Sequence, residues 1–186
     1  MDARELAKLV QDFSVLGKAL DSFFGSMSNN SNGFITQPDS LLVDYCNKAA
    51  DYCQVLSTPN LQQAEQLLIA ALKYSFERYG PFGYFFNGDM LHKLGWTEMV
   101  LGNHSKAEEI LKFGLEFYRN RGNQFSEAGR RKCELTIYAT LGGCLLTSQR
   151  WRERWCEICA LLDGNPYAHA DWPNVRARVQ AGQNPW

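Results

Sequence analysis

Apolar residues recur along most of this chain at the three- and four-residue spacing of an α-helix. The clearest example is the stretch from Asn87 to Tyr118, which Gly102-Asn103 divides into two halves. The apolar positions are Met90, Leu94, Met99 and Leu101 in the first half, and Ala107, Ile110, Leu111, Gly114, Leu115 and Tyr118 in the second. Gly and Asn both tolerate left-handed backbone angles and can end a helix. The pattern therefore predicts an antiparallel helical hairpin.

The start of the second helix carries polar residues that suit a helix N-terminus. Asn103 or Ser105 is expected to cap it, because their side-chain oxygens can accept a hydrogen bond from an otherwise unpaired backbone N–H. Glu108 and Glu109 are expected in the first turn, where the helix dipole favours negative charge. We interpret both carboxylates as structural, not as a general acid and base.

The same periodicity predicts helices in the rest of the chain, so the expected fold class is all-α. The expected ranges are 2–24, 40–56, 61–79, 88–101, 124–148, 150–162 and 171–181. Between the first two lies the stretch 25–39, which is dominated by Ser, Asn and Gly. This composition is typical of a flexible linker.

Residues 1–24 are expected to form an amphipathic helix with one broad apolar stripe. The stripe comprises Leu6, Leu9, Val10, Phe13, Leu16, Leu20, Phe23 and Phe24. Leu6, Phe13 and Leu20 are spaced seven apart. The sequence leaves open whether this helix packs on its own domain or forms a homodimer with a second copy. The linker would also allow it to dock elsewhere on the chain and compete with a partner.

Leu94-Gly95, Gly102 and Ala107 have the spacing of a known helical repeat, and this stretch resembles the tetratricopeptide repeat (TPR). Gly95 and Ala107 would let two helix backbones approach closely, and Gly114 occupies the place of that family's second small packing residue. The stretch departs from the family at Glu98, Leu111 and Arg119, where an aromatic residue, a second aromatic residue and Pro are usual.

Weaker copies of this pattern flank the central one. Ala64 aligns with Ala107 at an offset of 43, and Leu141-Gly142 aligns with Leu94-Gly95 at an offset of 47. Both offsets exceed the roughly 34 residues of a standard TPR. The longer units and the phrase ALKYSFERYGPFG resemble the kinesin-light-chain subtype. The resemblance implies three helical hairpins over 40–162 in a right-handed superhelix, with 163–186 as a C-terminal capping segment.

In TPR proteins the first helices of successive repeats line a concave face that binds a partner, and the resemblance places these positions in this chain. The first-helix positions are Cys46, Ala49, Cys53 and Leu56 in the first repeat, His92, Trp96 and Met99 in the second, and Thr136, Ala139, Gly143 and Leu146 in the third. Of these, the expected partner-binding residues are His92, Trp96, Met99, Cys53, Leu56, Ala139 and Leu146. Trp96 can equally belong to the core. The Lys and Asn residues with which chaperone-binding members hold a carboxylate are missing.

Composition narrows the classes of partner. A net charge of -1 gives no electrostatic case for nucleic acid or a membrane surface. No apolar run approaches the roughly 20 residues of a transmembrane helix. The first residues, MDARELAKLV, lack the pattern of a signal peptide. The expected localisation is therefore cytoplasmic.

Six cysteines are the main candidates for chemistry. They lie at positions 46, 53, 133, 144, 156 and 159. We interpret them as reduced, mostly buried thiols, because they fall among apolar residues of predicted helices. Trp155-Cys156-Glu157-Ile158-Cys159 contains a C-x-x-C motif, but we expect it inside a helix, where thiolate formation is not favoured. The sequence therefore predicts no enzyme, no metal site and no cofactor.

The expected function is that of an adaptor that binds an apolar or amphipathic segment of another protein in a TPR-like groove. An alternative is a self-associating structural or assembly protein. In that case the groove would be filled by the chain's own N-terminal helix or by a second copy. A redox protein is a third reading, which rests on the C-x-x-C motif alone.

Overall fold

The computed structural model describes residues 43, 47, 48, 50, 51, 54, 60–121 and 125–186, and all regular structure within them is helical. The helices are α4 (Leu61–Tyr79), α5 (Asn87–Val100), α6 (His104–Asn120), α7 (Glu127–Thr147), α8 (Trp155–Leu162) and α9 (Trp172–Gln180). The described residues between 43 and 54 are also helical. The predicted all-α class is confirmed. The predicted N-terminal helix 1–24 and linker 25–39 lie outside the described residues.

The predicted hairpin is present as α5 and α6. Gly102 turns the chain between them with a φ of 86°, in the left-handed region that glycine adopts without strain. Its N–H donates to the carbonyl of Met99 at 3.0 Å, and the N–H of Asn103 donates to the carbonyl of Glu98 at 2.8 Å. These bonds satisfy the last carbonyls of α5.

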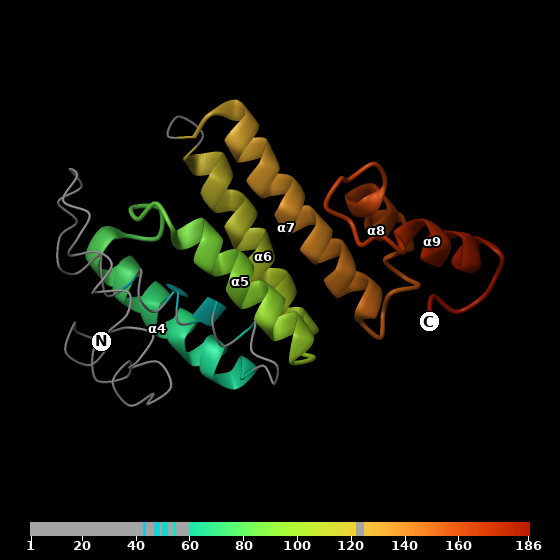
Figure 1. Ribbon diagram of the computed structural model, residues 1–186, viewed down its shortest axis with the longest axis horizontal. Coiled ribbons are helices and arrows are strands. Elements are labelled where there is room, and N and C mark those ends of the chain that lie inside the picture. Colours follow the sequence, from blue (N-terminus) through green and yellow to red (C-terminus); the bar gives the residue numbers. More distant parts are fainter. Residues whose placement is uncertain (1–42, 44–46, 49, 52–53, 55–59, 122–124) are drawn as a thin grey trace, which may run out of the picture.

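The helices form two layers, and Figure 1 shows α4 to α7 side by side with α8 and α9 beyond α7. One layer contains α5, α7 and the described residues between 43 and 54. Asn47 donates from Nδ2 to Oδ2 of Asp89 on α5 at 3.0 Å, and His92 on α5 pairs with Thr140 on α7 at 2.8 Å. The first helices of consecutive hairpins are therefore neighbours.

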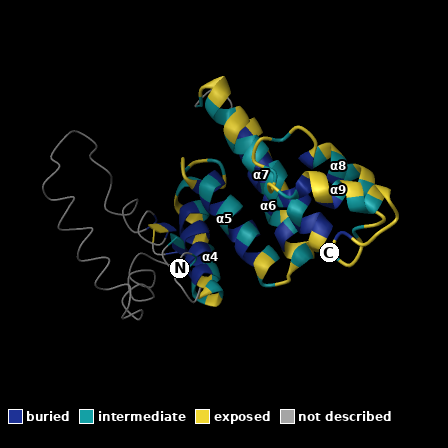
Figure 2. Ribbon diagram, turned by 45° about the vertical axis from the view of Figure 1, so that its right-hand side comes forward, coloured by how far each residue is buried: buried dark blue, intermediate teal, exposed yellow. Residues whose placement is uncertain are grey.

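The other layer contains α4, α6 and α8. Lys106 on α6 forms an ion pair with Glu65 on α4 at 2.8 Å, and Arg154 at the start of α8 pairs with Glu108 on α6 at 2.9 Å. Each layer also packs on the other, with α5 on α4 and α6, and α7 on α6 and α8. Figure 2 shows buried residues where the helices meet and exposed ones on their outer surfaces.

Small residues lie where the two layers are closest. A Cβ added at Gly95 would lie 2.6 Å from Cδ2 of Leu111 on α6. In the next hairpin, a Cβ at Gly142 would lie 2.5 Å from Cδ2 of Leu162 on α8. The repeat alignment pairs these two glycines. Both leave space for a leucine of the following helix, so the close approach predicted at Gly95 is present.

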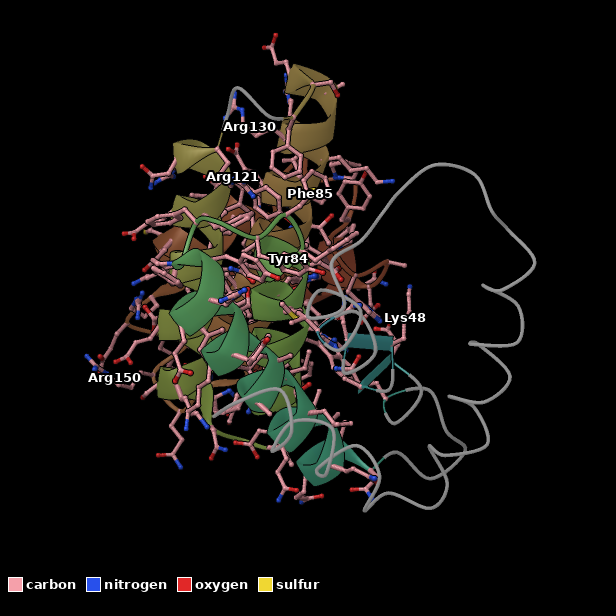
Figure 3. All side chains as sticks on the ribbon, turned by 90° about the vertical axis from the view of Figure 1, so that its left-hand side faces the viewer. Lys48, Tyr84, Phe85, Arg121, Arg130 and Arg150 are labelled. Atoms are coloured by element: carbon pink, nitrogen blue, oxygen red, sulfur yellow. The ribbon has the colours of Figure 1, made fainter. Side chains whose placement is uncertain are left out.

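The loop between α4 and α5 is aromatic and covers the joint between two hairpins. Phe82 packs against Phe113 of α6, with ring centroids 5.8 Å apart. Phe85 stacks on Phe125, which precedes α7, at 4.8 Å. Figure 3 shows Phe85 and Arg121 at the same end of the molecule. The loop that follows α4 therefore packs against both α6 and the segment just before α7.

The predicted start of α6 is correct in part: Asn103 holds the N-cap position, but the capping hydrogen bond is absent. Asn103 precedes the helix, but its Nδ2 donates to Oε2 of the fully buried Glu98 at 2.8 Å, and its side chain makes no cap hydrogen bond. A buried carboxylate is costly unless donors surround it, which explains this use of Asn103. Ser105 lies inside the helix, and Glu108 and Glu109 lie beyond its first turn. Glu108 instead reaches across to α8.

Two helix starts also differ from prediction. α7 begins at Glu127, not at residue 124, because the Ser126 hydroxyl accepts a hydrogen bond from the N–H of Gly129 at 3.1 Å. α8 begins at Trp155, not at residue 150, because residues 149–154 form successive turns. The C-x-x-C motif therefore opens a helix, which corrects the expectation that it lies within one.

The C-terminal segment turns back after α9. Trp172 at the start of α9 packs against Trp155 with ring centroids 5.6 Å apart, and its indole N–H donates to Oδ1 of Asp163 at 3.0 Å. Gly182 ends the helix with a φ of 76°. The chain then buries Pro185 and leaves the side chain of Trp186 exposed.

Candidate binding face

The predicted residues of α5 form one stripe that faces α7. His92, Trp96 and Met99 are spaced four and three apart, which places them on the same helix face, and all three are half-buried. His92 contacts Thr140 of α7, and a Cβ added at Gly143 of α7 would lie 3.9 Å from Sδ of Met99. Trp96 lies between these two contacts on the stripe and is neither fully exposed nor fully buried.

His92 forms a hydrogen bond with Thr140 of α7. Nε2 of His92 lies 2.8 Å from Oγ1 of Thr140, and the same hydroxyl lies 3.2 Å from the carbonyl of Thr136. Burial lowers the pKa of His92, and the charge of Asp89 only partly opposes this shift. His92 is therefore a neutral residue at pH 7 that links α5 to α7.

The predicted residues of α7 line an apolar cavity of about 220 Å³. Ala139 and Leu146 contribute to its wall, together with Gly143. The rest of the lining comes from Thr147, Leu162, His169, Asp171, Trp172, Val175 and Trp186. The structure thus brings Ala139 and Leu146 together at a cavity, next to the stripe of α5.

Sequence reasoning missed the part of this cavity that α9 and the C-terminal tail supply. Trp172 and Val175 are three residues apart, a helical spacing that could have indicated an inward-facing pair. Both are buried, whereas 67% of the Trp186 surface remains exposed. The segment expected only to cap the stack therefore also forms one wall of a cavity.

The polar side of α5 faces described residues between 47 and 54. Lys93 pairs with Asp51 at 2.7 Å and with Asp89 at 2.8 Å, and Gln54 donates from Nε2 to Oγ1 of Thr97 at 2.8 Å. The predicted partner-binding residues Cys53 and Leu56 lie outside the described residues, as do Cys46 and Ala49.

A second cavity of about 520 Å³ lies between the start of α6 and the end of α7, and polar residues dominate its lining. It contains His104 and Cys144, whose Nδ1 and Sγ atoms are 3.9 Å apart. The thiol donates to the carbonyl of His104 at 3.4 Å, and burial raises the pKa of Cys144 to about 11. The raised pKa favours the protonated thiol, which is a poorer nucleophile than the thiolate.

The C-x-x-C motif has mixed surroundings. Cys156 is exposed, which corrects the prediction of mostly buried thiols, while Cys159 is half-buried and Cys144 is buried. Burial, with the nearby charge of Asp163, raises the pKa of the Cys159 thiol. This shift favours the protonated form of the Cys159 thiol.

Other site classes find no support in the described part of the chain. No three His, Cys, Asp or Glu side chains gather there as metal ligands. None of its helices combines the length and apolarity required to cross a membrane. No protein-family model, curated protein or solved structure matches this chain.

Proposed function

We propose that this chain is an adaptor whose TPR-like hairpins bind an apolar or amphipathic segment of another protein along the face of α5 and α7. The observation that supports it best is the apolar cavity of about 220 Å³ on α7, whose wall residue Gly143 lies close to the half-buried Met99 of α5. Interfaces of this kind depend on a few large side chains that enter well-packed pockets. Adjacent first helices provide a continuous surface for such a segment.

Several features agree with this proposal and disfavour enzyme or nucleic-acid functions. The net charge is -1, and the cysteine thiols with shifted pKa values, Cys144 and Cys159, are shifted upward. Trp and Met side chains suit an adaptable apolar contact. The proposal includes a TPR-like superhelix of the kinesin-light-chain type and a cytoplasmic location.

A self-associating assembly protein is the second candidate function. The observation in its favour is the broad apolar stripe of residues 1–24, with Leu6, Phe13 and Leu20 spaced seven apart. In this case the stripe of a second copy, or of the same chain, would occupy the face of α5 and α7. Mass in solution, with and without residues 1–24, separates this function from the adaptor.

The adaptor proposal is tested by affinity capture with the intact chain and with Trp96→Ala. We expect the variant to lose at least about tenfold in affinity for captured proteins, the effect of removing a central aromatic contact. Phe86→Ala is the control, because Phe86 is also an aromatic residue and is exposed, but it precedes α5 and is outside the stripe. Equal capture by wild type and Trp96→Ala would contradict the proposal.

A further inference from the structure

We propose that the cavity on α7 is an anchor pocket for one aromatic side chain of the bound segment, a tryptophan or a tyrosine. The inference rests on the proposed function, since it names the residue type that the partner must present. Three observations support it: the size of the cavity, the unexplained glycine in its wall and the chemistry of its lining.

The size of the cavity fits a single ring. Its volume is about 220 Å³. An apolar cavity of about 150 Å³ is enough to bind benzene in a protein core, whereas pockets for whole small-molecule ligands range from about 300 to 1,000 Å³. A ring the size of an indole or a phenol therefore matches it better than a cofactor.

Gly143 has no packing role that explains it. Gly95 and Gly142 each face a leucine so closely that a Cβ would lie within 2.6 Å of it, but a Cβ at Gly143 would meet only Sδ of Met99, at 3.9 Å. Glycine within a helix costs stability relative to alanine. At position 143 its effect is to keep the cavity open, with Ala139 one turn away.

The lining is aromatic on the side opposite α7. Trp172 is held in place by its contact with Trp155 at 5.6 Å and by its hydrogen bond to Asp163 at 3.0 Å. Trp186 stands at the cavity with 67% of its surface exposed. Aromatic rings pair favourably edge to face or offset, so these two indoles favour an aromatic occupant over an aliphatic one.

Three polar residues, Thr147, His169 and Asp171, belong to the lining, and Asp171 carries the carboxylate that can select among aromatic rings. The carboxylate of Asp171 accepts a hydrogen bond from Nδ2 of Asn174 at 2.7 Å and lies 3.4 Å from Nη2 of Arg178. A carboxylate can accept about four hydrogen bonds, so capacity for a further donor remains. An indole N–H or a phenol O–H can supply that donor, and phenylalanine cannot.

The test uses N-acetyl amides of Trp, Tyr, Phe and Leu as probes of the full chain, followed by NMR. We expect saturable shifts of the Trp172 and Trp186 indole N–H signals and of the Ala139 methyl signal. The Trp and Tyr probes should bind at least about tenfold more tightly than the Leu probe, with Phe between them. Equal binding of all four probes, or shifts elsewhere only, would overturn the inference.

Variants that fill the cavity supply the control. Gly143→Leu and, independently, Ala139→Leu should abolish the shifts, whereas Ala128→Leu adds the same side chain to an exposed position of α7 and should leave them intact. Because Gly143→Leu removes a helix glycine, we expect folding to be retained, which circular dichroism checks. Unchanged probe binding in both filled variants would place the probes outside the cavity and overturn the inference.

A peptide library screened against the same protein separates this inference from the proposed function. Peptides that bind the face of α5 and α7 without needing Trp or Tyr would overturn the aromatic anchor and leave the adaptor function standing. The probes could also bind in the cavity without being displaced by any peptide or captured protein. That result would support a binding site for an aromatic ring but contradict the adaptor function. Binding peptides that share a Trp or Tyr and compete with the probes would support both.

Discussion

Adjacent glycines in α7 have different neighbours. Gly142 faces Leu162 of α8, which is itself buried, whereas Gly143 faces the cavity. A side chain at the first position must displace a packed leucine, but one at the second enters open space. The two positions therefore distinguish a glycine required for packing from one that preserves a cavity.

Alanine at these two positions should change stability in opposite directions. Gly142→Ala should lower the free energy of unfolding by about 1 to 3 kcal/mol through overpacking. Gly143→Ala should raise it by up to about 1 kcal/mol, because alanine favours the helix. Chemical denaturation of each variant measures both effects. If both variants lowered the free energy of unfolding by a similar amount, Gly143 would also be a packing residue.

Glu98 is a position at which this chain differs from the tetratricopeptide repeat that it resembles. It is fully buried, pairs with Lys106 and accepts a hydrogen bond from Asn103. Lys106 also pairs with Glu65 of α4, so one ammonium group joins α4, α5 and α6. These donors accommodate the carboxylate at a position where the repeat that this stretch resembles has an aromatic residue.

Lys106→Met should destabilise the protein by about 3 kcal/mol, since it leaves a buried carboxylate without its cation. Adding Glu98→Met should recover most of that loss, because it removes the buried carboxylate that Lys106, itself half-exposed, would otherwise neutralise. Thermal unfolding of the single and double variants tests this. A double variant less stable than Lys106→Met would contradict this account of the pair.

At the level of elements, α6 and α8 are joined by a polar contact rather than by a broad apolar one. Arg154 donates to both carboxylate oxygens of Glu108, at 2.9 and 3.3 Å, and pairs with Glu157 at 2.6 Å. The hydrogen bond from Arg154 lowers the pKa of Glu108, and the one from Lys112 adds to this shift. α8 is short, so this link positions it on α6.

The link should make stability depend on pH. Because the folded state lowers the pKa of Glu108, its contribution is present above the unfolded value near 4.5 and is lost as pH falls through the lower folded pKa. Glu108→Gln should therefore cost about 1 kcal/mol at pH 7 and progressively less below pH 4. Denaturation at pH 7, 4 and 3 measures this, with Glu109→Gln, an exposed neighbour, as control. A cost independent of pH would contradict the assignment.

Periodicity predicted most helices well, and contacts between helices account for the errors. Leu61–Tyr79 matches its predicted range, since apolar spacing and Asn60 define both the face and the start. The start of α8 was missed because Trp151 looks like a helical core residue in the sequence but lies in a turn and packs against Trp155 at 6.1 Å. Part of the cavity was missed because α9 forms one of its walls. The position of α9 beside α7 depends on the path of the chain after α8, which periodicity does not reveal.

At the scale of the whole molecule, the described helices form a stack in which each hairpin contacts the next. The exposed end of such a stack needs a cap, and α9 fills this place beside α7 and α8. On the face of α5 and α7, His92 contacts Thr140, and Met99 lies close to Gly143 in the wall of the cavity. Whatever binds it must compete with any segment of this chain that fits the same surface.

Deleting residues 1–24 should strengthen partner binding by at least about twofold, because a tethered competitor has an effective concentration in the millimolar range. The motivation is the apolar stripe with Phe13, Phe23 and Phe24, and the Ser/Asn/Gly-rich stretch that follows it. Phe23→Ser with Phe24→Ser in the full chain should act similarly. Unfolding on deletion would make this segment part of the core, and a halved mass would make it a dimer contact; either result contradicts competition.

The central claim, that the face of α5 and α7 binds a partner segment, is tested most directly by mapping amide chemical shifts on addition of a bound peptide. The largest changes should fall on His92, Trp96, Met99, Ala139, Gly143 and Leu146, and the exposed outer face of α6, at Lys112, Glu116 and Arg119, should remain unchanged. Changes centred on α6, or on the polar cavity around His104 and Arg154, would contradict the account.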